Sequence, residues 1–204
     1  MMRHATALLA VIAAALLAAC ASAPLHYYTL LPGSAAPAPV VESATAIPFE
    51  VLTVNVPAQV DRPQLVVRQG GQSVALLEGE RWIAPLADEV RGALAADLAR
   101  ALPGRDVGGM AAGGKPLLQV SLDVRRFDSQ PGDHALIEGA WQLRWRQGGK
   151  LTTQACTSRI RAAVGPGYDA LVQGHQQALE QLAEQMAGVA RALASGQPAA
   201  CPEG

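Results

Sequence analysis

The N-terminus carries the feature that most constrains this chain, a short apolar run that ends in a cysteine. Arg3 and His4 give a basic start, residues 5–17 are almost wholly apolar, and Leu17-Ala18-Ala19-Cys20 closes the run. A charged start, a short apolar stretch and small residues before a cleavage point are typical of a secretory signal peptide. The run is shorter than the ~20 apolar residues that a membrane-spanning helix needs. The sequence therefore predicts export and removal of residues 1–19.

The four residues that end this run resemble the bacterial lipobox. The resemblance implies that Cys20 receives a thioether-linked lipid, that cleavage occurs before it, and that the new amino terminus is acylated, for example with palmitate. Each buried methylene adds about 0.8 kcal/mol to membrane binding, so several chains hold a protein stably. Ala21 stands where lipoproteins of the inner membrane usually carry aspartate, which implies the periplasmic face of the outer membrane. The alternative is an ordinary signal peptide in which Cys20 is incidental.

The mature chain is long enough for one domain with a hydrophobic core. Removing residues 1–19 of the 204 leaves 185, with 15 basic and 17 acidic residues and a net charge of −2. This balance argues against nucleic acid as a partner. We expect a lipid anchor, a short first strand and a Pro/Ala-rich loop at residues 20–46, a domain at 47–195, and a tail at 196–204.

Patterns of apolar residues predict an α+β fold. Alternation of apolar and polar residues predicts strands at 26–31, 47–56, 64–68, 73–77, 118–124, 137–145 and 151–160. Helical spacing predicts one helix from about Pro85 to Pro103 and another from Tyr168 to Leu193. The short connections favour a mostly antiparallel sheet with both helices packed on one face.

Two cysteines besides Cys20 could form a disulfide, which an oxidising periplasm permits. Cys156 is predicted on a strand face with Thr152, Gln154 and Ser158, outside the core, and Cys201 lies in the tail that could fold back over that face. We expect Cys156 and Cys201 to be bonded as a structural cross-link. The alternative is two free thiols.

No residue pattern indicates catalysis. His26, His134 and His175 have no second histidine or cysteine at ligand spacing, so a metal site is not expected, and His175 is predicted at a surface or an interface. Asp123 and Asp128 are predicted to face opposite sides of a strand and to be solvated. The sequence predicts a protein that is not an enzyme, with no cofactor other than the lipid on Cys20.

Several segments resemble the PqiC family, the auxiliary lipoproteins of ABC-type transport. They follow the lipobox in order over almost the whole mature chain: Tyr27-Tyr28-Thr29-Leu30, Asp61-Arg62-Pro63-Gln64, Arg81-Trp82 with Pro85-Leu86, Arg126-Phe127-Asp128, Ala140-Trp141-Gln142-Leu143 and Gly167-Tyr168-Asp169-Ala170-Leu171-Val172. Members often carry Ala-Glu before the Pro-Leu pair. This chain has Ile83-Ala84, which puts in doubt any role for an acidic group there.

The resemblance implies a non-enzymatic part of a lipid-transport system. Such lipoproteins operate beside MCE-domain proteins and an ABC permease and ATPase, and they support envelope integrity. The implied role is an adaptor that binds an MCE partner or copies of itself. The candidate contact residues are Asp61, Arg62, Gln64 and Trp82. For the first three the simpler interpretation is an exposed turn, and for Trp82 it is a side chain that fills the core.

A different class of function stays open. The domain could be a carrier that holds a phospholipid in its own pocket, which needs an apolar cavity of several hundred Å³. A composition that is half hydrophobic but only 4% aromatic does not separate the two hypotheses. A peptidoglycan-binding or hydrolytic lipoprotein would need a catalytic set that this sequence lacks.

Overall fold

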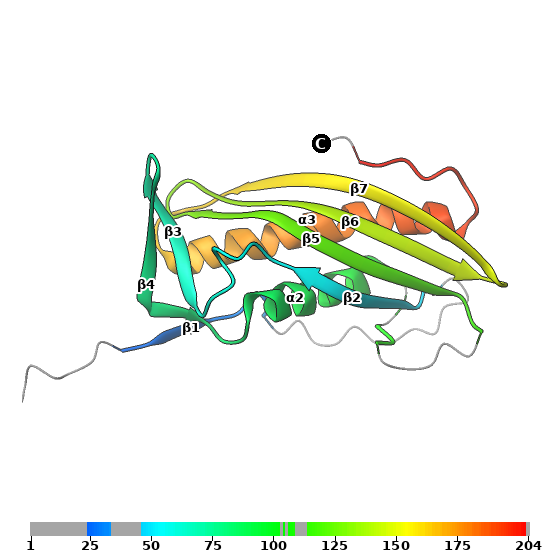
Figure 1. Ribbon diagram of the computed structural model, residues 1–204, viewed down its shortest axis with the longest axis horizontal. Helices are drawn as coiled ribbons and strands as arrows, with labels where there is room; N and C mark the ends of the chain where they lie inside the picture. Colours follow the sequence, from blue (N-terminus) through cyan, green and yellow to red (C-terminus); the bar gives the residue numbers. More distant parts are fainter. Residues whose placement is uncertain (1–23, 34–45, 103, 105, 109–113, 203–204) are drawn as a thin grey trace, which may run out of the picture.

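Three long antiparallel strands form the largest part of this computed structural model, which describes residues 24–33, 46–102, 104, 106–108 and 114–202. They are β5 (Leu117–Gln130), β6 (His134–Gln147) and β7 (Lys150–Ala163), and each pairs antiparallel with the next (Figure 1). Strict alternation explains the strands, because Leu118, Val120 and Leu122 are buried while the residues between them are not. Gly148 and Gly149 have positive φ in the β6–β7 turn. The three predicted strands are confirmed.

A fourth strand completes this large sheet. β2 (Phe49–Asn55) runs parallel to the first half of β5, from Phe49 opposite Leu118 to Asn55 opposite Asp123, and the strand order is β2-β5-β6-β7. A parallel pair needs a long crossover connection. Here the chain between β2 and β5 contains two further strands and a helix. The sheet is therefore mixed, although two of its three strand pairings are antiparallel, as predicted.

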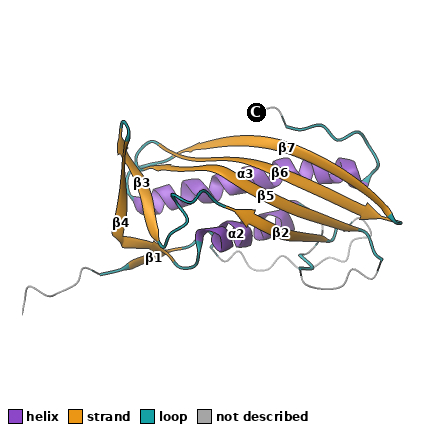
Figure 2. Cartoon of the chain, in the orientation of Figure 1, coloured by secondary structure: helices purple, strands orange, loops and turns teal. Residues whose placement is uncertain are grey.

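Both helices cover one face of the large sheet, as predicted. α2 (Leu86–Ala101) packs on β2, and α3 (Tyr168–Ala194) packs on β6 and β7 and against α2 (Figure 2). The α3 residues that face the sheet and α2 recur at three- and four-residue spacing, among them Leu179, Leu182 and Met186, all at most 1% exposed. Neither described helix is long and apolar enough to cross a membrane.

A second, smaller sheet stands at one end of the domain, where the sequence predicted one continuous sheet. β3 (Gln64–Gly70) and β4 (Ser73–Trp82) form the expected hairpin around Gly71 and Gln72, and β1 (His26–Tyr28) pairs parallel with β4. β2 ends opposite Asp123, so on that edge the second half of β5 has no strand partner, and β3 packs against this half, where Arg68 bonds Asp128. The α+β class of a single domain is confirmed, with the strands divided between two sheets.

Candidate functional site

The chain nearest the expected lipid anchor is held by contacts from three separate elements. β1 pairs with β4, and Glu80 on β4 accepts a hydrogen bond from the hydroxyl of Tyr28 at 2.7 Å and lies 3.0 Å from Nδ1 of His26. The hydrogen bonds from His26 and then from Tyr28 lower the pKa of Glu80. This carboxylate therefore fixes both neighbours of Tyr27 to β4.

Glu89 and Gln176 hold the residues that follow β1. Glu89, 4% exposed on α2, accepts the hydroxyl of Thr29 at 2.8 Å and the backbone N–H of Leu30 at 2.7 Å. Gln176 on α3 donates to the carbonyl oxygens of Thr29 and Leu31 at 3.1 and 3.3 Å. We call residues 26–31 the clamped segment. Its first residue is six positions after Cys20, so the domain is tied closely to that cysteine, which itself lies outside the described residues.

Sequence reasoning did not single out Glu89 as a contact of the clamped segment. In the sequence it is one of two acids in the first turn of a helix, where negative charge favours the helix dipole. A signal was available, because Glu89 lies three residues after Leu86 and immediately before Val90, both fully buried. That spacing places Glu89 on the apolar face of α2, where a carboxylate requires hydrogen-bond donors.

The predicted contact residues lie together at the small sheet. Asp61 is exposed in a turn whose backbone N–H donates to the carbonyl of Pro57 at 3.1 Å. Arg62 is partly buried, and its Nε has no hydrogen-bond partner among the described residues. Gln64 donates to Glu78 across β3 and β4 at 3.1 Å. Asp61 is therefore open to a partner, the Nε of Arg62 is buried within a side chain that is partly exposed, and Gln64 is engaged within the sheet.

Trp82 does not join them on the surface. Its backbone N–H donates to the carbonyl of Pro63 at 2.8 Å, which brings the main chain beside Arg62. Its indole, however, turns inward: Trp82 is 5% exposed and meets the ring of Phe127 edge to face, with centroids 6.1 Å apart. The assignment of Trp82 as a partner contact was wrong, because alternation along β4 directs this ring into the core.

Asp128 is the centre of a buried ionic cluster and is not solvated as predicted. It is 7% exposed, accepts from Nε of Arg68 at 2.6 Å and from Arg126 at 2.7 Å, and lies 3.7 Å from Nε2 of His134. Burial alone would raise the pKa of this carboxyl, but the hydrogen bonds from Arg68 and Arg126 outweigh burial and lower it. The cluster joins the small sheet to the large one.

The orientation predicted for Asp123 and Asp128 was also wrong. A β-bulge between Val124 and Arg126 shifts the register of β5, so Asp123 pairs with Ala140 and Asp128 with Leu136. These two β6 positions share one face, because they are four residues apart. The separation along β6 is about 13 Å, too far for the paired carboxylates of a hydrolase.

His175 is fully buried, where the sequence predicted a surface position. Its Nε2 forms a hydrogen bond with the hydroxyl of Ser129 at 2.8 Å, and its ring stacks on Phe127 with centroids 3.9 Å apart. Burial lowers the pKa of His175 to about 3, so the ring is neutral. Ser129 is itself 5% exposed, and Nδ1 of His175 has no hydrogen-bond partner among the described residues. The pair therefore serves packing between β5 and α3.

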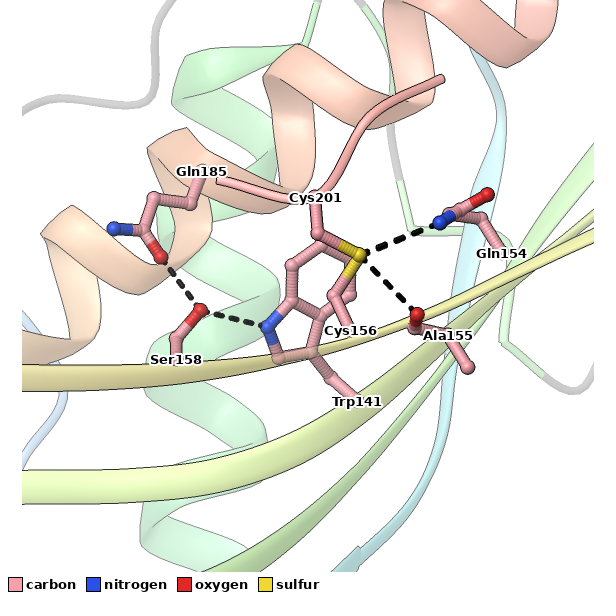
Figure 3. Close-up of a disulfide and its surroundings, with 7 residues drawn as sticks. All are labelled: Trp141, Gln154, Ala155, Cys156, Ser158, Gln185 and Cys201. Carbon is pink, nitrogen blue, oxygen red and sulfur yellow. Dashed lines mark hydrogen bonds between the residues drawn. A yellow bond between two sulfur atoms is a disulfide. The ribbon is translucent and has the colours of Figure 1, made fainter. Parts of the chain in front are cut away.

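Cys156 and Cys201 form a disulfide that ties the chain after α3 to β7 (Figure 3). Their Cα atoms are 5.5 Å apart, and Gln154 donates to the sulfur of Cys201 at 3.3 Å. Cys156 is 7% exposed and belongs to the core, so its predicted place outside the core was wrong. The cause is α3, which covers this face of β7: Ser158 donates to Gln185 at 2.6 Å and accepts from Trp141 at 2.9 Å.

The face of the large sheet away from the helices carries an open hollow of about 690 Å³. It is lined by residues of all four strands and by Cys201 and Pro202, and half of these residues are polar, among them Thr53, Ser121, Asp123, Gln142 and Thr157. A second hollow of about 530 Å³ lies over glutamines and glutamates of α3. Neither has the enclosed apolar lining that acyl chains require. Within the described part of the chain, no group of three or more His, Cys, Asp or Glu side chains could hold a metal ion.

Comparison with known proteins relates the chain to one family. No curated protein matches it. Two crystal structures share its fold: an uncharacterized protein at 20% identity, with a TM-score of 0.61 over 81% of this chain and 97% of the other, and a Xanthomonas campestris protein at 16% identity, with a TM-score of 0.53 over 84% and 97%. The family model of the ABC-type transport auxiliary lipoprotein component matches residues 28–187. The chain therefore belongs to the family of ABC-type transport auxiliary lipoproteins.

Proposed function

We propose that this chain is a lipid-anchored auxiliary subunit of an MCE/ABC-type system that carries lipid between membranes, and that it acts by binding partners and not by catalysis. The family match over residues 28–187 is the observation that carries the transport role. The lipobox resemblance supports lipidation at Cys20, and Ala21 supports an outer-membrane location on the periplasmic side. In that place the domain would dock the far end of an MCE conduit and so support envelope integrity.

The clamped segment supports the anchoring part of this proposal. An adaptor can hold its partner in a fixed position relative to the membrane only if its membrane anchor is rigidly joined to its partner-binding surface. Residues 26–31 are bonded to Glu80 on β4, Glu89 on α2 and Gln176 on α3. Thus two helices and the small sheet all fix residues 26–31, so the chain from His26 onward is part of the rigid domain.

Asp61 and Arg62 are the proposed contacts with the partner, which is an MCE protein or a second copy of this chain. Asp61 is exposed, and Arg62 has a buried Nε without a hydrogen-bond acceptor among the described residues. Because Arg62 as a whole is only partly buried, the rest of its side chain could meet a partner beside Asp61. Gln64 contributes by holding Glu78 and so ordering β4 beside this turn. No observation favours the carrier alternative, because both hollows are open to solvent and neither encloses a ligand.

The proposal is tested by crosslinking in intact cells, detergent extraction and capture of this protein. We expect the wild type to bring with it an MCE-domain protein and its ABC permease. Asp61→Lys should lose that capture, and so should reversal of both Asp61 and Arg62. The matched control is Asp123→Lys, because the side chain of Asp123 is 58% exposed and lies on the opposite face from the helices.

Three outcomes would overturn parts of the proposal. Capture that is unchanged by Asp61→Lys in a folded protein would refute this contact surface. Recovery of the protein without an MCE partner, but with bound phospholipid, would support the carrier instead. An unmodified Cys20 in the mass of the mature protein would refute the anchor.

A further inference from the structure

Three exposed apolar side chains gather around the strand that follows Cys20. Leu25, Tyr27 and Ile83 are 45%, 55% and 60% exposed. Tyr27 pairs with Arg81, and the backbone N–H of Ile83 donates to the carbonyl of Tyr28 at 2.9 Å, so the pairing of β1 with β4 continues to Ile83. We call Leu25, Tyr27 and Ile83 the apolar end patch.

Strand alternation puts these three side chains on one face. Tyr28 and Trp82 pair with each other and point toward the core, where Trp82 is 5% exposed. The residues beside them, Tyr27 and Ile83, therefore point outward, and Leu25 shares the face of Tyr27 because it is two residues away. The patch is bordered by Arg81, whose side chain is 32% exposed and lies 3.9 Å from Glu78. It is thus a small apolar surface with a charged rim.

The distance to Cys20 limits what can cover this patch. Five residue steps separate Cys20 from Leu25, which span at most ~18 Å even when fully extended. Because the clamped segment fixes residues 26–31 to both helices and to β4, no flexible hinge follows within the domain. The patch is therefore held within one short tether length of any bilayer that holds the lipid of Cys20.

We infer that the apolar end patch rests in the headgroup region of the bilayer that anchors Cys20, which sets the orientation of the domain. This inference rests on the proposed lipidation. Tyrosine suits that region because its ring is apolar and its hydroxyl is polar, and leucine and isoleucine add apolar area next to it. Arg81 at the rim is placed to meet lipid phosphates.

The orientation has a consequence for the rest of the domain. β1 and the small sheet lie at one end of the long axis, and the β6–β7 turn lies at the other (Figure 1). A domain that rests on its β1 end projects that turn away from the membrane. Leu151, which follows the turn and is 46% exposed, is then far from lipid.

The experiment uses the mature lipoprotein reconstituted into phosphatidylethanolamine–phosphatidylglycerol vesicles. Cys20 carries the lipid and Cys156 is bonded to Cys201, so one introduced cysteine is the only free thiol. Ile83→Cys is labelled with a polarity-sensitive nitrobenzoxadiazole probe, and Leu151→Cys is the matched control. Both residues are exposed, so neither substitution opens the core. Flotation with the vesicles is measured on the same samples.

We expect the probe at Ile83→Cys to show blue-shifted emission and severalfold stronger quenching by brominated lipid than the probe at Leu151→Cys. Equal signals from the two probes in protein that floats with vesicles would overturn this inference and leave the anchor intact. Protein that fails to float would overturn the anchor as well. A signal at Ile83→Cys that falls when Tyr27→Ser is added would identify the patch itself as the contact.

Discussion

Arg68 on β3 donates from Nε to Oδ1 of Asp128 on β5 at 2.6 Å, across 60 residues of sequence. The carboxylate is buried and receives Arg126 as well, while the side chain of Arg68 is 30% exposed. Two sheets that share no strand pairing thus meet at one ionic contact. The apolar contact of Val67 with Ala135 and Leu171 lies next to it.

Removing the charge of Asp128 should weaken this junction. Asp128→Asn leaves Arg68 and Arg126 without their carboxylate, and breaking a largely buried pair costs about 3 kcal/mol of unfolding free energy. Asp123→Asn is the matched control on the same strand, and its side chain is 58% exposed, so we expect a change within about 0.5 kcal/mol. Urea unfolding measures both. Equal midpoints for the two variants would show that the cluster does not stabilise the fold.

Opening the disulfide should destabilise the domain. The bonded cysteines are 45 residues apart in sequence, and closing a loop of that length restricts the unfolded chain. Cys201→Ser should lower the unfolding free energy by about 2–4 kcal/mol. Wild-type protein unfolded in the presence of a reductant is the control, and its midpoint should match that of the variant. A variant as stable as oxidised wild type would contradict the prediction.

His175 should make stability depend on pH. Its pKa in the folded state is about 3 against 6.5 in the unfolded chain, so between these values the unfolded chain binds a proton that the folded protein does not. The unfolding free energy contributed by this group falls as pH decreases, by about 1.4 kcal/mol per unit. Wild-type stability minus that of His175→Gln should therefore decrease from pH 7 to pH 4.5.

The difference between the two proteins is the quantity to measure, because another group acts in the same range. Burial raises the pKa of Asp97 to about 6, so its contribution falls as pH rises. Asp97 is present in both proteins and cancels in the difference. A difference that stays constant with pH would mean that His175 gains its proton while buried.

Two glycines of α3 should respond in opposite ways to alanine. At Gly174 an added Cβ would overlap a methyl group of Val164 and lie 3.1 Å from Cβ of Ala135, so Gly174→Ala should destabilise the domain by about 1–3 kcal/mol. At Gly188 nothing lies within 4 Å of the added atom. Gly188→Ala should raise stability by about 0.5–1 kcal/mol, because alanine favours a helix. Thermal unfolding of both variants would settle this, and a gain from both would show that α3 can shift on β6.

The strands and helices with a local period could be predicted from the sequence. β5, β6 and β7 alternate, and α3 has its stripe at helical spacing. The parallel pairing of β1 with β4 and of β2 with β5 could not be predicted. The paired strands are 50 or more residues apart, and the local sequence pattern of a strand does not show which distant strand it pairs with. The second sheet follows from those pairings.

The wrong predictions for Asp128, His175 and Cys156 have different physical causes. The β-bulge after Val124 reverses the face of the sheet on which Asp128 lies, and no residue type at that position predicts a bulge. His175 was predictable, because it lies four residues from both Leu171 and Leu179 on the buried stripe of α3. Cys156 lies four residues from buried Ile160 on the same strand face. The polar residues Thr152 and Gln154 on that face favoured the wrong prediction that the face is exposed to solvent.

The parallel pairing of β1 with β4 determines how the domain bears a mechanical load. Under the proposed lipidation of Cys20, a pull along the axis of β1 would reach the domain through this strand. The hydrogen bonds between β1 and β4 lie across that axis, so they are sheared together and are not peeled apart one at a time. Glu80, which holds both His26 and Tyr28, shares the load. A partner that pulls on the domain would thus load all the hydrogen bonds between β1 and β4 at the same time.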